Sequence, residues 1–497
     1  MKTCLKLAAI VAGLAGGIPD HLEAQPLLPT AQVAGDAGTP PPALREPLTR
    51  DLEQRLATHD RAGRWRSADS SLLAWSCGQE LSAQVDLFQA TGERKWLDQL
   101  VRHADAMFAH LTPNRDGFLS WRSRSYSSFR ILVRRAEGDR SQAVVEPAEQ
   151  WLRQAQPWTR ELLRPALTGQ ALVVDWEYHL TWREGAQVEV RGATTDKVLS
   201  TVTVRAGEPF TALPGVTLTW RGAPVAGDRF TLSVQQPKDF DHAVHDGVIL
   251  TQICRFIALV RTDPGLREAY GRQAEGYLKV IRSDLIPKWK PYWRDCGDGG
   301  LLVAPTDEAL TYPGISLPHN QYLALGNALI WLDRITGDRA YRDQVTRMAR
   351  FFKSHLRLVE DRYEWNYWDA AGAWDRPWDK PEEKRAEDTG HGSLDISFVV
   401  DAAEAGIVFD RTDLQRLANT FLRKMWNGSL TKPTVGGYVN TAKPTRQSGN
   451  LQDWVRLSRQ APQVLAVCAR VIPQTGSVKA KAQLLRLLAE AARGTHR

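Results

Sequence analysis

Apolar residues recur at helical spacing along most of the chain, and one two-helix pattern occurs three times. The segments from Val85 to Gln99 and from Leu332 to Gln344 each contain a helix pattern, a Thr-Gly turn and a second helix pattern anchored by an aromatic residue. A weaker copy runs from Leu259 to Tyr270. In the first two copies, Gly92 and Gly337 stand where a left-handed residue ends a helix, and the acidic residue that follows favours the next helix. The pattern therefore predicts repeated helical hairpins.

Repeated hairpins must stack to bury their apolar faces, either as an open solenoid or as a closed ring. Polar clusters fall between the hairpins, which suits a ring whose loops converge on one central cleft. We therefore expect a mainly α fold, an (α/α) toroid of helical hairpins, formed by residues 48–169 and 237–497.

Residues 170–236 interrupt the helical pattern with alternating or β-rich runs that are separated by turn clusters. We expect a small antiparallel β insertion of five or six strands in this region. The predicted strands lie in the runs Ala171–Trp182, Gln187–Arg191, Leu199–Arg205, Val216–Trp220 and Arg229–Val234. Such an insertion serves either to grip a substrate or as a lid or packing unit.

The N-terminus has the pattern of an exported protein. Two lysines precede an apolar run from Leu7 to Gly17, which is too short to span a membrane and is typical of a signal peptide over residues 1–24. Residues 25–47 are rich in Pro, Gly, Ala and Thr and predict a disordered leader. We therefore expect a secreted or periplasmic protein.

Charge and motifs narrow the class of partner. The net charge is +7, but the basic residues are scattered, whereas nucleic-acid binding needs a basic cluster. The diffuse positive charge suits either an anionic polymer or a solvated surface. No later stretch is apolar enough to predict a membrane span. We expect no nucleic-acid partner and no cofactor, since a P-loop, a dinucleotide fingerprint, a zincin motif and a nucleophile elbow are all lacking from the sequence. The oligomeric state is not indicated.

Cysteine and tryptophan usage add two expectations. Cys77, Cys254, Cys296 and Cys468 lack metal-ligand spacing, and we expect buried free thiols and no metal site. The chain has 18 Trp against 13 Phe and 11 Tyr. A tryptophan either anchors helix packing or, in a polar loop, stacks on a sugar ring. The loop candidates for stacking are Trp121, Trp365, Trp368, Trp374 and Trp454.

The candidate chemistry is concentrated between Tyr312 and Asp395. Three polar clusters, Tyr312–Gln321, Tyr363–Trp368 and Glu387–Asp395, each lie at the edge of a helical pattern. Together they contain amide, imidazole, phenol, carboxylate and indole groups. Sugar sites use this mixture, because flat aromatic faces suit pyranose rings while amides and carboxylates bind hydroxyls. The clusters indicate a helical, carbohydrate-active enzyme.

These clusters support a family resemblance. The segments that carry it are His245-Asp246-Gly247, Leu317–Gln321, Glu364–Trp368 and Glu387–Asp395. They resemble motifs of toroid-fold bacterial polysaccharide lyases of the glucuronan- or alginate-cleaving type, and the ring is similar to glucuronyl C5-epimerase catalytic domains. The resemblance implies a polysaccharide lyase that cleaves a uronic-acid polymer by β-elimination, with an anionic polysaccharide as its substrate.

Such a lyase needs a group that neutralises the uronate carboxylate, a base for the C5 proton and an acid for the departing O4. The resemblance implies Asn320, with Gln321, for the first role. It implies His245 and His391 as base or orienting residues, and Tyr367, with Tyr312 in reserve, as acid. The other residues implied in substrate binding are Glu80, Arg122, Arg255, Glu364, Trp365, Glu387, Asp388 and Trp454, of which the two arginines would hold further carboxylates.

Each candidate also has a structural interpretation. Asn320 and the Glu387-Asp388 pair suit helix caps, His245 and His391 suit helix starts, and Tyr367 suits a core anchor. A glycoside hydrolase on the same ring would instead use two of the available acids, among which is Asp395. A C5-epimerase would share the proton abstraction, and a glycan-binding protein would need only aromatic and hydrogen-bonding groups. The combination of amide, imidazole and phenol favours elimination.

Overall fold

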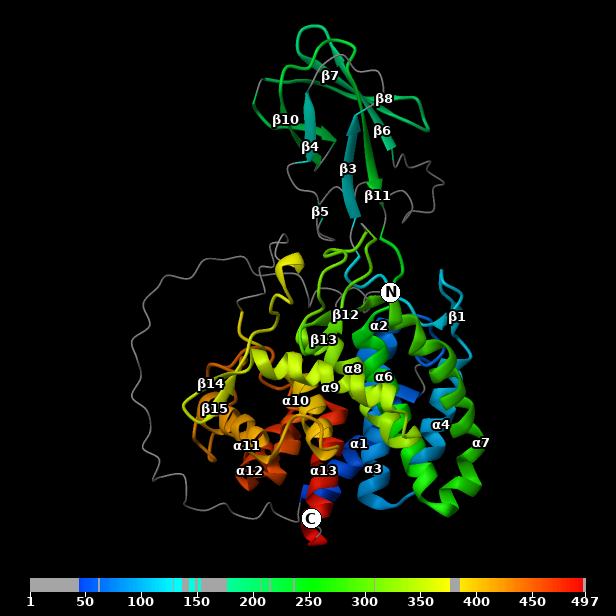
Figure 1. Ribbon diagram of the computed structural model, residues 1–497, viewed down its shortest axis with the longest axis vertical. Helices are drawn as coiled ribbons and strands as arrows, with labels where there is room; N and C mark the ends of the chain where they lie inside the picture. The colour runs from blue at the N-terminus through cyan, green and yellow to red at the C-terminus, as the bar shows by residue number, and fades with distance from the viewer. Residues whose placement is uncertain are drawn as a thin grey trace. The chain divides into compact units, whose positions relative to one another are not determined.

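The computed structural model describes residues 44–60, 63–127, 129–135, 143–147, 151–152, 177–205, 207–213, 216–235, 237–307, 309–375 and 385–494. They form two compact units, which we describe separately (Figure 1). The helical unit comprises Ala34–Ser123, Phe240–Pro305 and Gly314–Arg497, and the β unit comprises Arg124–Asp239 and Thr306–Pro313. The predicted signal peptide, residues 1–24, and residues 25–43 of the predicted leader lie outside the described residues.

The helical unit carries the α-helices of the described chain. They are α1 (Arg45–Asp60), α2 (Ser70–Leu72), α3 (Gln79–Thr91), α4 (Lys95–Phe108), α6 (Ala243–Thr262), α7 (Pro264–Val280), α8 (His319–Thr336), α9 (Arg339–His355), α10 (Thr389–Glu404), α11 (Arg411–Asn419), α12 (Pro462–Val471) and α13 (Val478–Ala492). Shorter 3-10 or π turns are η5 (Leu73–Gly78), η6 (Ile281–Leu285), η7 (Pro287–Tyr292), η8 (Ala373–Asp375), η9 (Thr420–Met425), η10 (Trp454–Arg459) and η11 (Ile472–Gln474).

The helical unit also contains three two-stranded antiparallel ribbons. They are β1 (Thr112–Pro113) with β2 (Leu119–Ser120), β12 (Trp293–Cys296) with β13 (Gly299–Leu302), and β14 (Arg357–Val359) with β15 (Arg362–Glu364). The last of these ribbons leads directly into the polar segment that contains Trp365 and Tyr367.

The three predicted helical hairpins are present, as α3–α4, α6–α7 and α8–α9. Gly92 ends α3 with a φ of +75° and Gly337 ends α8 with a φ of +68°, as the sequence pattern predicts. Asp338 then caps α9 by accepting from the backbone N–H of Ala340. In the weaker copy Asp263 caps α7, whose first residue, Pro264, needs no hydrogen-bond acceptor.

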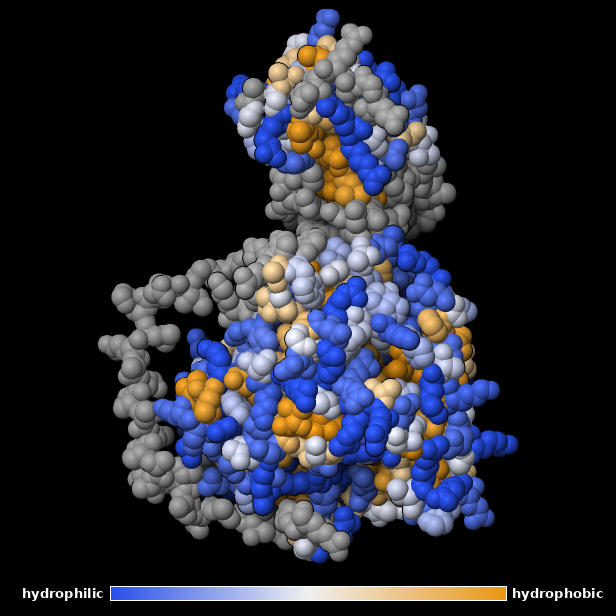
Figure 2. Space-filling view, in the orientation of Figure 1, coloured by the Kyte–Doolittle hydropathy of each residue, from blue (hydrophilic) through white to orange (hydrophobic). Residues whose placement is uncertain are grey.

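Helix α6 lies at the centre of the helical core. It packs against α8, α7 and α3, and fourteen of its twenty residues are buried. By length and hydropathy α6 alone among the described helices is long and apolar enough to cross a membrane, yet 83% of its most apolar window is buried inside the helical unit. That burial is typical of the core helix of a globular unit. On the face shown in Figure 2, hydrophobic residues of the helical unit form only separate patches among hydrophilic ones.

The β unit contains two antiparallel sheets around a core of its own. The six-stranded sheet has the order β5-β3-β11-β6-β7-β8 and the three-stranded sheet the order β4-β10-β9. The strands are β3 (Phe129–Arg135), β4 (Val144–Pro147), β5 (Trp151–Leu152), β6 (Glu177–Arg183), β7 (Gln187–Gly192), β8 (Val198–Thr203), β9 (Phe210–Leu213), β10 (Val216–Arg221) and β11 (Arg229–Gln235). Side chains alternate between buried and exposed along β6, so that Tyr178, Leu180 and Trp182 enter the core.

The structure corrects the predicted fold class. Each of the five predicted β runs contains a strand, but strands also occur between residues 112 and 152, in the range that we assigned to helices. The described chain therefore combines its helices with five sheets, and the prediction of an (α/α) toroid with a small β insertion is wrong. Short runs such as β3 are too brief to be distinguished from buried helix by hydrophobic periodicity alone. Periodicity also identifies hairpins without showing how they are arranged.

The four cysteines of the described chain are free thiols. Cys77, Cys254 and Cys468 are buried, Cys296 is half-buried, and these four form no disulfide with one another. Burial raises the pKa of the Cys77 thiol to about 12.

Helices α6 and α8 are in close contact at Gly247. A Cβ at Gly247 would lie 2.2 Å from the carbonyl carbon of Ala324 and 2.3 Å from the backbone nitrogen of Leu325. Neither backbone atom can move without the whole helix. We therefore expect Gly247→Ala to lower the free energy of unfolding by about 1–3 kcal/mol or more, measured by urea denaturation.

Gly276→Ala in α7 is the matched control, because a Cβ there would meet nothing within 4 Å. Alanine is the better helix former, so this variant should be neutral or more stable by about 0.5–1 kcal/mol. Equal unfolding midpoints for the two variants would contradict the close contact between α6 and α8.

Candidate functional site

The segment before α10 is held between two other segments by backbone hydrogen bonds. The N–H of Glu387 donates to the carbonyl of Trp365 at 3.0 Å, and the N–H of Val439 donates to the carbonyl of Glu387 at 2.9 Å. The N–H of Thr389 donates to the carbonyl of Gly437 at 3.0 Å. These bonds place Glu387 and the residues that follow it at a defined position beside Trp365.

Asp388 begins helix α10. Its Oδ1 accepts hydrogen bonds from the N–H groups of Gly390 and His391, both at 2.9 Å. Its Oδ2 lies 2.6 Å from Nδ1 of His391. Burial alone would raise the pKa of Asp388, but the hydrogen bonds and charge of His391 hold it below the usual value. Asp388 is therefore an ionised cap that also orients the imidazole ring.

The two glycines around His391 are required by crowding. A Cβ at Gly390 would lie 2.8 Å from Oε1 of Gln447 and 2.9 Å from Nδ2 of Asn450. A Cβ at Gly392 would lie 3.3 Å from the ring of Trp454. The Gly-His-Gly sequence therefore lets the first turn of α10 fit beneath the segment that carries Gln447 and Asn450.

A pair of carboxyl groups, Glu387 and Asp395, is buried behind this turn. Oε1 of Glu387 accepts from the N–H of Asp388 at 2.8 Å, and Oδ2 of Asp395 accepts from Nε1 of Trp365 at 2.9 Å. No N–H group of the described chain reaches Oε2 of Glu387 or Oδ1 of Asp395, and the two carboxyl groups interact with each other through a side-chain hydrogen bond, which requires a proton on one of them. Burial, together with the charges of Asp395 and Asp388, raises the pKa of Glu387 well above its usual value. Burial also raises the pKa of Asp395 to about 7.

Glu387, Asp388 and His391 form a potential metal-ligand set. Each offers one ligand atom, and these atoms all lie within 4.8 Å of one another. Within the described residues, no other group of three or more His, Cys, Asp and Glu side chains has this arrangement. We call Glu387, Asp388, His391 and Asp395 the acidic turn.

The outer side of the acidic turn is aromatic and basic. The rings of Tyr367 and His391 meet edge to face with their centroids 5.1 Å apart. The guanidinium carbon of Arg385 lies 5.1 Å from the centroid of the Tyr367 ring, and a guanidinium nitrogen lies 4.0 Å from Oδ2 of Asp388. The side chains of His391 and Arg385 are 36% and 44% exposed, so a ligand can reach both.

Helix α8 starts next to this surface. The N–H of His319 donates to the carbonyl of Tyr367 at 3.3 Å, and Nε2 of His319 lies 2.9 Å from Oδ2 of Asp369. Asn320 follows in the first turn of α8 and is buried, and its Nδ2 meets no acceptor within the described chain. The structure thus brings together Tyr367, His391, Glu387 and Asp388, and places the helix start that carries Asn320 and Gln321 beside Tyr367.

The two candidate tryptophans of the site belong to the core. Trp365 and Trp454 are fully buried, and their stacked rings have centroids 6.2 Å apart. Nε1 of Trp454 donates to the carbonyl of Thr389 at 2.9 Å, so this ring also supports the start of α10. Their faces are covered by other side chains, and they anchor packing where we predicted sugar stacking. Trp121 and Trp368 are buried as well, and Trp374 is 42% exposed.

Other predicted site residues lie apart from the acidic turn. His245 is buried at the start of α6, with Nδ1 2.9 Å from Oγ of Ser70, and burial lowers its pKa well below the usual value. Arg255 contacts the buried carboxylate of Asp86 in the middle of α3. Tyr312 belongs to the β unit.

Three further predicted residues have structural partners. Nη2 of Arg122 donates to Oγ1 of Thr112 at 3.3 Å. Glu364 in β15 pairs with Arg362 at 3.5 Å. Glu80 is buried in the first turn of α3, where its Oε1 lies 2.8 Å from Nδ1 of His59. These contacts give each residue a role in its own part of the helical unit.

Sequence reasoning overlooked Arg385 and Asp369. Arg385 lies two residues before Glu387, and a basic residue next to an acidic pair is the signal that marks it. Asp369 follows the aromatic cluster Tyr363–Trp368, but only the fold shows that it faces His319.

Comparison with known proteins gives no family. No family model and no curated protein matches the chain. Among solved structures, FlgL of Xanthomonas campestris is 12% identical, with 43% of this chain and 76% of that chain covered and a TM-score of 0.16. The flagellar junction protein FlgL from Legionella pneumophila is 14% identical, with 42% and 76% covered and a TM-score of 0.17.

These findings correct the functional identification. The solved structures named above are flagellar proteins, and none of the comparisons supports a polysaccharide lyase. The resemblance to uronate lyases and C5-epimerases is therefore wrong. The lyase activity and the enzyme class that it implied are wrong as well. The alternatives of a hydrolase or an epimerase lose the toroid on which they were based. TM-scores this low carry no argument for a flagellar role of this chain either.

Glu80 allows a test of the buried environment that the structure gives it. Burial raises its pKa to about 8, so the folded chain keeps a proton that the unfolded chain releases from about pH 4.5 upward. Stability should therefore fall as the pH rises between these two values. Glu80→Gln, which cannot ionise, should remove that part of the slope, on the order of 5 kcal/mol. Urea denaturation across this pH range measures it.

The control is Glu268→Gln, which changes an exposed carboxyl group in α7. Its stability profile should run parallel to that of the wild-type protein. If the Glu80→Gln profile is parallel too, Glu80 is ionised in the folded chain and its assigned environment is incorrect.

Proposed function

We propose that the helical unit binds one divalent cation at the acidic turn, with Glu387, Asp388 and His391 as protein ligands. The observation that carries the proposal is the convergence of their ligand atoms within 4.8 Å of one another. Oε2 of Glu387 is buried and receives no hydrogen bond from an N–H group of the described residues. An oxygen in that position gains most from a cation, because leaving a buried acceptor unsatisfied is costly.

The charge balance of the acidic turn supports a cation. Several other buried acids of the helical unit contact a basic side chain: Asp246 lies 2.9 Å from Lys288, Asp401 lies 2.6 Å from Arg456, and Asp413 lies 2.7 Å from Lys353. Glu387 and Asp395 form no ion pair with a Lys or Arg side chain within the described chain, whereas Asp388 lies 2.6 Å from Nδ1 of His391 and 4.0 Å from Arg385. Two buried carboxyl groups with raised pKa values, Glu387 and Asp395, therefore lack a Lys or Arg neighbour among the described residues, and a divalent ion would favour their ionised forms.

The ligand types favour a transition metal over magnesium or calcium. Imidazole suits zinc and related ions, whereas sites for magnesium and calcium use oxygen alone. A protein set of one imidazole and two carboxylates suits Zn²⁺, with Mn²⁺ as a weaker occupant. His391 is partly exposed, so the remaining coordination position is open to water or to an anionic ligand.

The surroundings give the ligand set the support that metal sites need. Asp388 is fixed by the N–H groups of Gly390 and His391, and Asp395 is fixed by Trp365. Such supporting hydrogen bonds hold ligands at one geometry and contribute to affinity.

The test is calorimetric titration of the chelator-treated protein with Zn²⁺, Mn²⁺ and Mg²⁺. We expect one site per chain, with affinity in the order Zn²⁺, Mn²⁺, Mg²⁺. Glu387→Gln, which keeps the shape of the side chain, and His391→Ala should each weaken Zn²⁺ binding by about tenfold or more. The circular dichroism of both variants should match that of the wild-type protein.

His110→Ala is the control, because it removes an imidazole at the end of α4 that hydrogen-bonds only to the carbonyl of Ala106 among the described contacts. It should leave Zn²⁺ binding unchanged. Absence of stoichiometric binding in the wild-type protein, or an unchanged affinity in Glu387→Gln and His391→Ala, would reject the site.

An anionic polysaccharide partner and export from the cell stay predictions. The exposed guanidinium of Arg385, beside Tyr367 and His391, is the described feature of the acidic turn that suits an anionic partner. Affinity electrophoresis in gels that contain alginate or pectate tests that partner. Retardation of the wild-type protein that is reduced in Arg385→Gln would support it. Equal mobility with and without the polymers would exclude it.

A further inference from the structure

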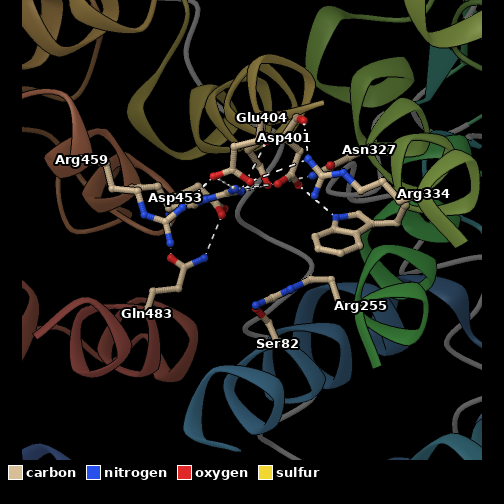
Figure 3. Close-up of polar contacts among 12 residues, drawn as sticks. Ser82, Arg255, Asn327, Arg334, Asp401, Glu404, Asp453, Arg459 and Gln483 are labelled. Carbon is tan, nitrogen blue, oxygen red and sulfur yellow. Dashed lines mark hydrogen bonds and ion pairs between the residues drawn. The ribbon is translucent and has the colours of Figure 1, made fainter. Parts of the chain in front are cut away.

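A second polar site lies inside the helical unit, away from the residues of the acidic turn. It is a cavity of about 200 Å³ lined by side chains from α3, α6, α8, α10, η10 and α13. Its lining contains five basic side chains, Arg255, Arg456, Arg459, Lys479 and Arg486. Figure 3 shows part of this set, with Arg459 and Arg334 approaching the carboxylates of Asp401 and Glu404 from opposite sides.

Each basic group is held by an acid. Nη2 of Arg456 donates to Oδ1 of Asp401 at 2.6 Å, and Arg459 reaches Glu404 at 2.6 Å. Lys479 donates to Asp453, which also accepts from Nε2 of Gln483 at 2.8 Å. The basic groups are therefore positioned before any ligand arrives, which lowers the entropic cost of binding.

The remaining two arginines share one carboxylate. Nη2 of Arg255 and Nε of Arg486 lie 2.5 Å and 2.9 Å from the same oxygen, Oδ1 of Asp86. Arg486 also donates to Glu490 at 2.8 Å, and Arg459 donates to the same residue at 3.0 Å. One acid thus serves two arginines in each case, and these shared acids link the basic groups of α6, η10 and α13.

The formal charges of the cluster leave a positive remainder. The basic residues are Arg255, Arg334, Arg456, Arg459, Lys479 and Arg486, and the acidic residues are Asp86, Asp401, Glu404, Asp453 and Glu490. Six positive charges against five negative charges leave a net charge of +1. Arg334 and Arg459 are partly exposed, and a bound anion would balance the remaining charge of the cluster.

At least one buried donor of the cluster has no acceptor among the described residues. Each arginine carries five N–H donors and no acceptor. The side chain of Arg456 is only 10% exposed, and its Nε meets no acceptor within the described chain. A ligand rich in oxygen atoms would satisfy such donors.

We propose that this cavity binds a small oxyanion, a phosphate, sulfate or carboxylate group, through the guanidinium groups of Arg255, Arg456 and Arg486 and the ammonium of Lys479. Charge-assisted hydrogen bonds from arginine to such oxygens are short and directional. The site is independent of the proposed cation, because no residue is common to the two sites.

The experiment measures the thermal midpoint of the chelator-treated full chain in chloride, acetate, sulfate and phosphate at equal ionic strength. A ligand that binds the folded chain alone raises the midpoint in a saturable way. We expect a saturable rise with at least one of the three oxyanions and none with chloride, and the responding salt identifies the preferred group. A response to chloride that equals all the others would overturn the proposal.

The variant Arg456→Gln should reduce the oxyanion-dependent rise by at least half, since it removes a lining guanidinium. The control, Arg261→Gln, breaks a surface ion pair with Glu275 and should keep the full rise. An equal rise in both variants would place the anion elsewhere.

If Arg456→Gln fails to fold, the wild-type chain still provides a test. Trp331 lines the cavity, so phosphate or sulfate should change its fluorescence, measured as the difference between the wild-type protein and Trp331→Phe. Equilibrium dialysis against radiolabelled phosphate and sulfate should give up to one bound anion per chain. No uptake of either anion, with no change in Trp331 emission, would reject the site.

Discussion

Asp388 is the residue on which the geometry of the candidate site depends. One carboxylate oxygen closes the first turn of α10 by accepting from two backbone N–H groups, and the other orients the imidazole of His391. Loss of such a cap typically costs about 1 kcal/mol in helix stability. Here it would also release the ring of His391, because the same side chain performs both tasks. The backbone of Glu387 forms hydrogen bonds with the backbones of Trp365 and Val439. These bonds fix the position of Asp388, the next residue, at the start of α10.

Charge compensation distinguishes the two polar regions of the helical unit. Around the cavity, acids and bases from α3, α6, α10, η10 and α13 neutralise one another almost completely, and the surplus is positive. At the acidic turn, Glu387 and Asp395 are buried with no Lys or Arg partner in the described chain, and burial raises the pKa of both groups, so ionising them is costly unless a cation is bound. Perturbed pKa values cluster at functional sites, and the carboxyl groups of the acidic turn and the basic groups of the cavity suit ligands of opposite charge.

The sequence predicted local features better than the arrangement of the chain. The hairpin around Gly92 and the strands at Gln187 and Val216 follow from periodicity and turn residues, which act over a few positions. The polar segments around Tyr367 and His391 meet because α10 starts directly beside the segment that follows β15. Both segments are recognisable in the sequence, because each combines polar residues with aromatic rings or an imidazole. The burial of Trp365 and Trp454 was not predictable, since a polar flanking sequence does not show which side of a ring is covered.

Contacts between residues that are distant in sequence account for the other differences between the predictions and the structure. Arg255 resembles a free substrate-binding arginine in sequence, but its partner Asp86 lies 169 positions earlier in the chain. Tyr312 stands only seven residues before His319, yet the two belong to different units. Hydrophobic periodicity carries no information on either relationship, and it also could not show how the hairpins are arranged.

Helix α10 links the two polar regions and explains why each has its own type of partner. Asp388 stands at its N-terminus, where the positive end of the helix dipole favours carboxylates, while Asp401 and Glu404 lie in its last turn, where the dipole opposes them. Asp401 and Glu404 therefore need Arg456 and Arg459, and these arginines bring positive charge into the cavity. Asp388 and Asp401 are about 20 Å apart along the helix axis at 1.5 Å per residue. Substitutions at that separation usually have additive effects, so the acidic turn and the cavity act as independent sites on one rigid element.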